Sequence, residues 1–238
     1  MSSSRLPGKV LIDLAGKPVL WHIVNRLKKS EFIEKIVVAT SNDDSDKAIV
    51  SWCQSNLVDF FVGELEDVLD RYYKTSVKFD ADPIVRITGD CPLVDPEIVD
   101  EVILNFLKGG YDAYSLGGEF PDGLDCQIFS FNAIEIAWER ATLKSEREHV
   151  GPFIEKNKEK IFKVSHLKKF NGLGHHRWTL DEEKDLIFLT EIFSKLSKNG
   201  DFFNTNDVLD FLNKNKHLMD INSKIVRNEG YLKSLEMD

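Results

Sequence analysis

Short apolar runs alternate with longer stretches of helical period in the first half of the chain. The apolar runs cover residues 35–40, 58–62 and 84–87. Such short β-branched runs are typical of buried strands in a parallel sheet. Segments in which apolar residues recur with helical spacing lie at 18–29, 43–55, 65–79 and 96–107. Strands that alternate with helices predict a doubly wound α/β sheet.

The pattern becomes mixed after about residue 111. Strands are expected at 113–115, 124–129 and 177–180, and helices at 132–142, 149–157 and 182–196. No linker rich in Pro, Gly or Ser interrupts the chain, so we expect one domain over residues 1–238. In such sheets ligands bind beyond the carboxyl ends of the strands, which directs attention to the loops that follow them.

Composition narrows the function classes. The chain has 31 basic and 40 acidic residues, and this balance disfavours a nucleic-acid partner. Its longest apolar runs are far shorter than the ~20 residues that cross a bilayer, so we expect a cytoplasmic protein with no membrane association. The three cysteines are widely spaced and odd in number, which predicts neither disulfides nor a zinc site.

The opening segment S-S-S-R-L-P-G-K, residues 2–9, has the composition of a phosphate-binding loop. Gly8 allows the backbone to approach an anion, Arg5 can bind two phosphate oxygens at once, and Lys9 supplies a point charge. The alternative is a frayed basic segment without function, which composition alone favours.

Two acids follow strand-like segments. Asp90 lies in R-I-T-G-D-C-P-L-V-D-P, and Asp181 lies in H-H-R-W-T-L-D-E-E-K-D. Either could be a turn or capping residue, and a helix N-cap is the interpretation we favour for Asp95. If Asp90 and Asp181 converge, they could hold one Mg²⁺ ion, although spacing alone cannot establish this.

Other motifs are less specific. F-P-D-G-L-D-C-Q, residues 120–127, and R-E-H-V, residues 147–150, could be solvated turns or substrate contacts. His175 and His176, as neighbours in an expected strand, should point to opposite faces, which argues against a histidine metal site. The chain lacks the G-x-S-x-G and G-x-x-x-x-G-K-S/T motifs, so serine-hydrolase and P-loop functions are excluded.

Taken together, S-S-R-L-P-G-K, G-K-P-V-L, V-A-T-S, D-V-L-D-R-Y, I-T-G-D-C-P-L, D-G-L-D and R-E-H-V resemble the cytidylyltransferase family. The similarity is greatest to the spore-coat polysaccharide biosynthesis type, which is related to the CMP-sialic acid, CMP-pseudaminic or legionaminic acid and CMP-Kdo synthetases. It runs from residue 2 to about residue 190. It implies a Rossmann-like, GT-A-like nucleotide-diphospho-sugar transferase fold with a mixed, mostly parallel sheet.

The resemblance also implies a set of site residues. By position, the triphosphate of CTP would contact Ser3, Ser4, Arg5 and Lys9; Mg²⁺ would contact Asp90 and Asp181; the base would lie near Thr40, Ser41 and Gly63; and the sugar would face Asp125, Gln127, Glu148 and His149. Residues to about 110 would form the nucleotide-binding half, 111–200 the acceptor half, and 201–238 a helical extension. The partners would be CTP and an acidic sugar, and a homodimer is allowed.

The chain departs from the family at three places. A first strand reading roughly I-I-Q-A-R-M is expected before the basic loop, yet this sequence starts at what resembles its methionine, so the first strand is missing from the chain. We therefore expect Met1 to be internal and the natural protein to begin ~10 or more residues upstream. Val62 replaces a customary arginine, and the segment 125–128 replaces D-V-E-V.

The expected reaction is in-line attack by a sugar hydroxyl on the α-phosphate of CTP, with release of pyrophosphate. Catalysis would come from positioning and charge neutralisation by Arg5, Lys9 and Asp90. Two alternatives stay open: a nucleotidyltransferase for another nucleotide or acceptor, and a non-catalytic sugar-nucleotide-binding protein of a polysaccharide cluster.

Overall fold

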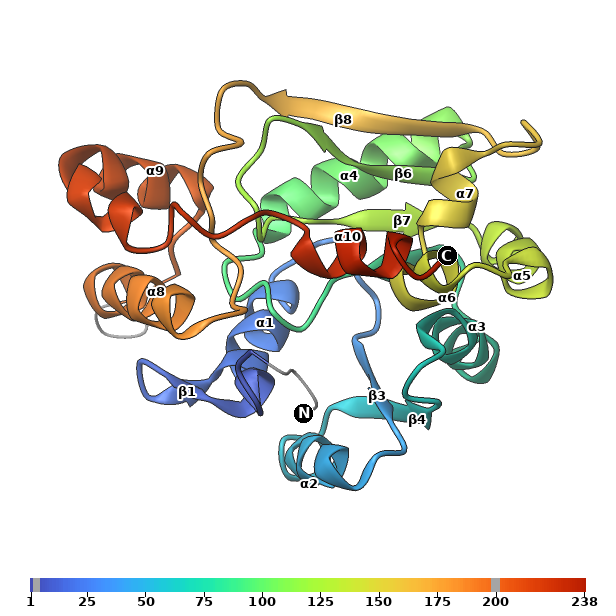
Figure 1. Ribbon diagram of the computed structural model, residues 1–238, viewed down its shortest axis with the longest axis horizontal. Coiled ribbons are helices and arrows are strands. Elements are labelled where there is room, and N and C mark those ends of the chain that lie inside the picture. Colours follow the sequence, from blue (N-terminus) through green and yellow to red (C-terminus); the bar gives the residue numbers. More distant parts are fainter. Residues whose placement is uncertain (2–4, 198–201) are drawn as a thin grey trace.

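The computed structural model describes residues 1, 5–197 and 202–238, and it has helices packed around two main sheets (Figure 1). The smaller sheet pairs β3 (Val37–Ser41) with β4 (Asp59–Gly63) in parallel. The larger sheet has the order β5-β7-β6-β8, formed by Ile84–Arg86, Gln127–Phe129, Ala113–Gly118 and Val164–Phe170. A small hairpin joins β1 (Asp13–Leu14) and β2 (Lys17–Pro18).

Helices surround both sheets. They are α1 (Val19–Leu27), α2 (Lys47–Ser55), α3 (Val68–Phe79), α4 (Pro96–Gly109), α5 (Phe131–Arg140), α6 (Lys144–His149), α7 (Pro152–Lys156), α8 (Glu183–Leu196), α9 (Thr205–Lys214) and α10 (Glu229–Leu235), with the short 3-10 helices η1 (Lys9–Leu11), η2 (Asp44–Asp46) and η4 (Lys216–Ile221). Helix α4 lies behind the larger sheet in Figure 1, while α10 passes in front of it.

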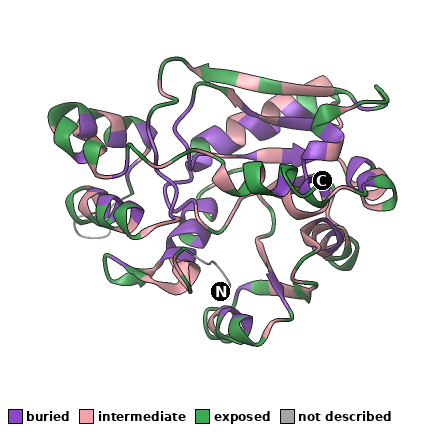
Figure 2. Ribbon diagram, in the orientation of Figure 1, coloured by how far each residue is buried: buried purple, intermediate pink, exposed green. Residues whose placement is uncertain are grey.

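The main core lies between the larger sheet, α4 and α8, where buried residues concentrate in Figure 2. Trp178, Ile128 and Val102 are completely buried there. A second cluster, around Phe129 and Ile134, packs α5 and α3 against the opposite part of the sheet. The apolar faces predicted from helical spacing therefore become the two cores that hold the strand ends in place.

The predicted α/β class is confirmed, with both parallel and antiparallel pairings. Strands β3, β4 and β5 match the first three predicted strands. Strand β7 is antiparallel to both of its neighbours, so the larger sheet is less parallel than the sequence indicates. Among the described residues, no strand joins β3 to β5.

Two features of the second half differ from expectation. Residues 177–180 form no strand beyond an isolated bridge at Arg177. Their backbone bonds go to loops instead: the Trp178 amide donates to the Asp122 carbonyl and the Leu180 amide donates to the Asp90 carbonyl. Strand β8 was not predicted, because it lies at a sheet edge, none of its residues is buried, and its apolar residues do not alternate with polar ones.

The ends of α4 follow the capping chemistry expected from sequence. The Asp95 side chain accepts a bond from the Glu97 amide, Pro96 occupies the first turn, and Gly110 ends the helix with a φ of 57°. The proposed N-cap role of Asp95 is therefore confirmed. The suggestion that Asp181 caps α8 is wrong: Glu182 holds that position, and Asp185 accepts a bond from its amide. The Asp181 carboxylate therefore does not cap the helix and makes other contacts instead.

No helix in the described part of the chain is long and apolar enough to span a membrane. The three cysteines are buried free thiols.

Candidate active site

The basic loop meets Asp90 and Asp181 at one point. Lys9 opens η1 directly after Gly8, whose φ of 73° turns the backbone in the left-handed region. The Lys9 Nζ atom donates to Asp90 Oδ2 and to Asp181 Oδ1, both at 2.8 Å. The acids are 91 positions apart in sequence, so tertiary folding creates this convergence.

The charges at this point stabilise one another. Burial by itself lowers the pKa of Lys9, but the carboxylates of Asp90 and Asp181 outweigh it, so the net pKa lies above the ordinary 10.5. Burial likewise acts to raise the pKa of Asp90, and the Lys9 ammonium reverses that effect to hold it below 3.8. Both groups are therefore charged throughout the neutral range.

Arg5 lies beside this pair. Its guanidinium contacts Asp181 at 3.3 Å, Glu182 at 3.5 Å and Glu229 at 2.9 Å, and its side chain is 29% exposed. A partly exposed guanidinium can exchange these carboxylates for phosphate oxygens. The predicted contacts Ser3 and Ser4 lie outside the described residues.

Arg177 is the functional residue that sequence analysis missed. It is 7% exposed, and its guanidinium binds Asp181 at 3.0 Å, Asp122 at 3.1 Å and Asp185 at 2.9 Å. Asn222, from the C-terminal segment, donates to Asp185 and to the Arg177 carbonyl. This buried network fixes the side of Asp181 that faces away from Lys9. The sequence did contain a sign of this pairing, since Arg177 stands four residues before Asp181 in H-H-R-W-T-L-D.

Gly123 of the D-G-L-D motif brings a second loop against the segment that carries Asp181. Its φ is 103°, and a Cβ atom there would lie 2.6 Å from the Thr179 amide nitrogen and from the Trp178 carbonyl carbon. The predicted sugar contact Asp125 accepts a bond from the Gly123 amide at 2.9 Å, so its carboxylate shapes this turn. The motif therefore sets the close approach of two loops.

The predicted base contacts lie at the carboxyl ends of β3 and β4, where Ser41 pairs with Gly63. The hydroxyls of Thr40 and Ser41 both donate to Asp46 and are buried. Gly63 makes room for Arg71, because a Cβ there would come within 3.0 Å of the Arg71 Cγ atom. The predicted base contacts therefore form a group at β3 and β4 that is separate from the cluster of Lys9, Asp90 and Asp181.

Arg71 is a further residue missed from the sequence, although D-V-L-D-R-Y contains it. Its Nη1 donates to the Glu64 carbonyl at 2.7 Å, while its buried Nε finds no partner among the described residues. Burial lowers its pKa from 12.5. It places a cation beside the turn where Val62 stands in the customary arginine's position.

The remaining predicted sugar contacts lie on β7 and α6. Gln127 accepts a bond from Arg86 at 2.8 Å and donates to Glu155 at 2.5 Å. Glu148 and His149, at the end of α6, both contact the hydroxyl of Ser234. Helix α10 thus reaches residues that sequence analysis placed beside the sugar.

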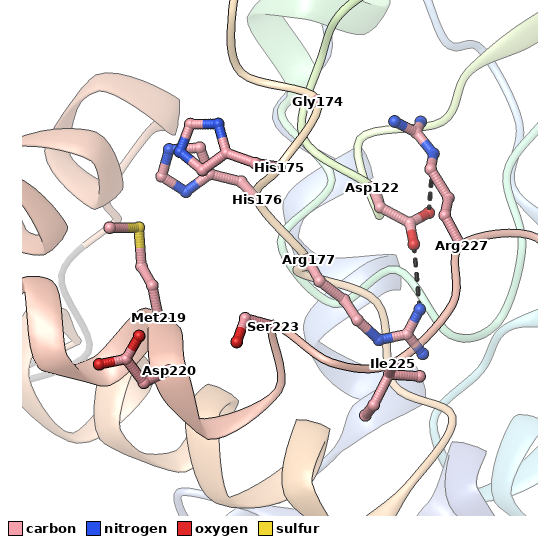
Figure 3. Close-up of a pocket in the computed structure, with 10 residues that line it drawn as sticks. All are labelled: Asp122, Gly174, His175, His176, Arg177, Met219, Asp220, Ser223, Ile225 and Arg227. Carbon is pink, nitrogen blue, oxygen red and sulfur yellow. Dashed lines mark hydrogen bonds and ion pairs between the residues drawn. The ribbon is translucent and has the colours of Figure 1, made fainter.

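A cavity of about 340 Å³ adjoins the site behind Arg177 (Figure 3). His175 and His176 line it with rings 4.3 Å apart, so the expectation that they point to opposite faces is wrong. The reason is that both lie in a loop, where the alternation of a strand does not apply. Figure 3 also shows Arg177 and Arg227 directed at Asp122 between them.

The donor set at Asp90 and Asp181 fits Mg²⁺. Both carboxylates already bind one cation, the Lys9 ammonium group. Mg²⁺ prefers hard oxygen ligands of this kind. No group of three or more His, Cys, Asp or Glu side chains in the described ranges could hold a metal. A site with two carboxylates leaves coordination positions for phosphate oxygens and water, as is usual for Mg²⁺ in phosphoryl-transfer enzymes.

Comparison with known proteins places this chain in a family. The sequence profile described as cytidylyltransferase matches residues 1–172. The chain is 39% identical to the uncharacterised protein MJ1063 of Methanocaldococcus jannaschii, over 96% of this chain and 93% of the other. It is 31% identical to the spore coat polysaccharide biosynthesis protein SpsF of Bacillus subtilis, over 90% and 91%.

A 3-deoxy-manno-octulosonate cytidylyltransferase from Geobacter sulfurreducens is 33% identical over 43% of this chain and 40% of its own. Among solved structures, a cytidylyltransferase from Leptospira borgpetersenii is 31% identical and superposes with a TM-score of 0.87, covering 95% of both chains. The chain belongs to the cytidylyltransferase family and is a nucleotidyltransferase.

Proposed function

We propose that the protein transfers CMP from CTP to an acidic sugar of the nonulosonic or octulosonic type, with release of pyrophosphate. One observation carries this proposal: the Lys9 ammonium is held at 2.8 Å by both Asp90 and Asp181. A phosphate-loop cation and two potential Mg²⁺ ligands therefore meet at one point, where a triphosphate could contact the cation directly and the two acids through Mg²⁺.

In this proposal the acidic and the basic residues of the site have different roles. Asp90 and Asp181 would hold Mg²⁺, which would neutralise charge on the triphosphate. Lys9 and Arg5 would exchange their carboxylate partners for phosphate oxygens and stabilise the charge that develops as the bond to pyrophosphate breaks. Arg177 keeps Asp181 in place from the buried side. No step needs a covalent enzyme intermediate, because the sugar hydroxyl attacks the α-phosphorus directly.

The acceptor would lie over β7 and α6. Arg86 supports an anionic or strongly polar acceptor, because it makes no ion pair within the described part of the chain and its buried Nε atom lacks a partner. Gln127 and Glu155 beside it provide hydrogen bonds for hydroxyl groups. The names of the octulosonate and spore-coat relatives support a sugar acid and a role in surface polysaccharide biosynthesis.

Pyrophosphate release tests the proposal. The purified protein is incubated with Mg²⁺, each of the four nucleoside triphosphates in turn, and a panel of nonulosonic and octulosonic acids, with neutral hexoses as control acceptors. We expect release with CTP and a sugar acid, and a CMP-sugar by mass spectrometry. Release with another nucleotide would reassign the base. Nucleotide binding without release on any of these acceptors would contradict the proposed acceptor class.

Asp90→Asn is the matched control for contaminating activity. The substitution keeps the side-chain shape but replaces a carboxylate ligand with a poorer amide. We expect it to retain the fold and lose most of the Mg²⁺-dependent release. Unchanged turnover in this variant would contradict the role given to Asp90.

A further inference from the structure

The C-terminal helix α10 lies across the acceptor side of the site. It contacts α6, whose last two residues are Glu148 and His149, and it passes in front of the larger sheet in Figure 1. The region that matches the family profile ends at residue 172, so the profile says nothing of this helix.

One end of α10 covers two residues placed beside the sugar. Ser234, which is 2% exposed, donates to Glu148 Oε2 at 2.7 Å and lies 3.0 Å from His149 Nε2. The Tyr231 ring meets the His149 ring edge to face, with centroids 5.1 Å apart. The side chains of Glu148 and His149 are therefore both engaged by the helix.

The other end of α10 contacts the phosphate loop. Glu229, the first helical residue, pairs with Arg5 at 2.9 Å, and the two side chains are 34% and 29% exposed. Glu229 also pairs with Lys233 one turn later at 2.7 Å. The same short helix thus joins the arginine assigned to the triphosphate with the residues assigned to the acceptor.

Contacts on both flanks keep the segment attached when the Arg5 bond breaks. After the helix, the Asp238 side chain accepts bonds from the Ser145 amide at 2.8 Å and from the Ser145 hydroxyl at 2.6 Å. Before it, Arg227 donates to the Phe120 carbonyl at 3.0 Å. Loss of the Arg5 contact would loosen α10 between two fixed points.

We propose that α10 forms a wall of the acceptor site and that nucleotide binding loosens this wall. Glu229 is the latch, which means that its ion pair with Arg5 holds the helix in place. Tyr231 and Ser234 are the residues of the helix that contact the acceptor. The inference rests on the proposed function, because it takes CTP as the ligand of Arg5. When phosphate oxygens bind Arg5, Glu229 loses a partner and faces added negative charge, so it moves away. CTP then binds before the acceptor.

Hydrogen–deuterium exchange tests the latch, with CTP and Mg²⁺ as the probe and no acceptor present. An exposed ion pair contributes a factor of about 1.4 to 5 to an equilibrium, so we expect CTP to speed exchange across residues 229–235 by a factor in that range. The same samples report CTP binding independently, through slower exchange near Lys9 and Asp90.

Two variants sharpen the measurement. Glu229→Gln removes the latch, so exchange in the helix should already be fast without CTP and should change little when CTP is added. Lys233→Gln removes the other partner of Glu229 but leaves the Arg5 contact, so the response to CTP should persist. An equal response in both variants would overturn the latch.

The outcomes separate this inference from the proposed function. If CTP protects the loop at Lys9 while exchange across α10 is unchanged, the latch is refuted and the nucleotide site stands. If CTP does not protect the loop, the nucleotide assignment fails and the latch fails with it.

Steady-state kinetics test the wall itself, with the sugar acid that supports pyrophosphate release. An aromatic contact contributes a factor of about 2 to 12, so Tyr231→Ala should raise the KM for the acceptor by that factor while the KM for CTP stays the same. Equal changes in both constants would indicate a general structural loss and would overturn the assignment of Tyr231.

Discussion

Replacing Lys9 with methionine tests how far the Lys9 charge offsets the repulsion between Asp90 and Asp181. The substitution keeps much of the side-chain length but removes the charge between Asp90 and Asp181. Each carboxylate oxygen lies 2.8 Å from Nζ, so the two can be at most about 5.6 Å apart, twice that distance. At an effective dielectric constant of about 20, two unit charges at that separation repel by about 3 kcal/mol.

The two carboxylates are 26% and 18% exposed, so solvent screening reduces the repulsion that this separation would give. We expect Lys9→Met to lose about 2 to 3 kcal/mol of unfolding free energy at pH 7. Millimolar Mg²⁺ should restore most of it, because the ion would occupy the space between the carboxylates. Without Lys9, repulsion would raise the pKa of Asp90 in the folded state above its unfolded value, so acidification should also lessen the deficit.

The assay is urea unfolding of the wild type and Lys9→Met at pH 7, with and without Mg²⁺. Lys28→Met is the control, since Lys28 is exposed and makes no ion pair with the described residues. CTP turnover should also fall in Lys9→Met and not in Lys28→Met. Equal stability losses in the two variants, or a Lys9→Met deficit that Mg²⁺ leaves unchanged, would refute the reasoning.

Two further predictions concern the surroundings of Asp181. Gly123→Ala should cost more than about 1 kcal/mol, because its φ is positive and its Cβ would meet the Thr179 amide at 2.6 Å; thermal unfolding measures this, and a neutral effect would contradict the close approach. Burial, and to a smaller extent the charge of neighbouring His175, lowers the pKa of His176 from 6.5 to about 4. The unfolded state therefore binds more protons than the folded state between pH 6.5 and pH 4. We expect the free energy of unfolding to fall by up to about 3 kcal/mol as the pH drops through this range. His176→Gln should reduce this slope in unfolding titrations, and an unchanged slope would contradict the assignment to His176.

The first half of the fold could be predicted because its strands and helices carry regular apolar patterns. Strands β3, β4 and β5 and helices α1 to α4 follow the predicted segments to within a few residues, apart from the one-turn 3-10 helix that precedes α2. The second half was harder, because extended segments such as 177–180 find backbone partners in loops rather than in a neighbouring strand. Strand β8 lacks a clear apolar alternation at its exposed edge.

The site was predictable where one motif contains the chemistry and unpredictable where tertiary contacts create it. Lys9 and Asp90 were identified from their loops, and the structure brings them together with Asp181. The buried network of Arg177 depends on Asn222, which is 45 residues away and lies in a segment with no motif of its own. No spacing rule links such residues, since their proximity arises only when the C-terminal segment packs against the core.

The most direct test of the central claim is a metal titration with Mn²⁺ as a spectroscopic substitute for Mg²⁺. In the presence of CTP, electron paramagnetic resonance would measure free Mn²⁺ against wild type, Asp90→Asn and Asp181→Asn. The account predicts that each substitution weakens binding at least about tenfold, equivalent to ~1.4 kcal/mol. Unchanged Mn²⁺ affinity in either variant, with CTP still bound, would contradict the claim that Asp90 and Asp181 hold one ion together.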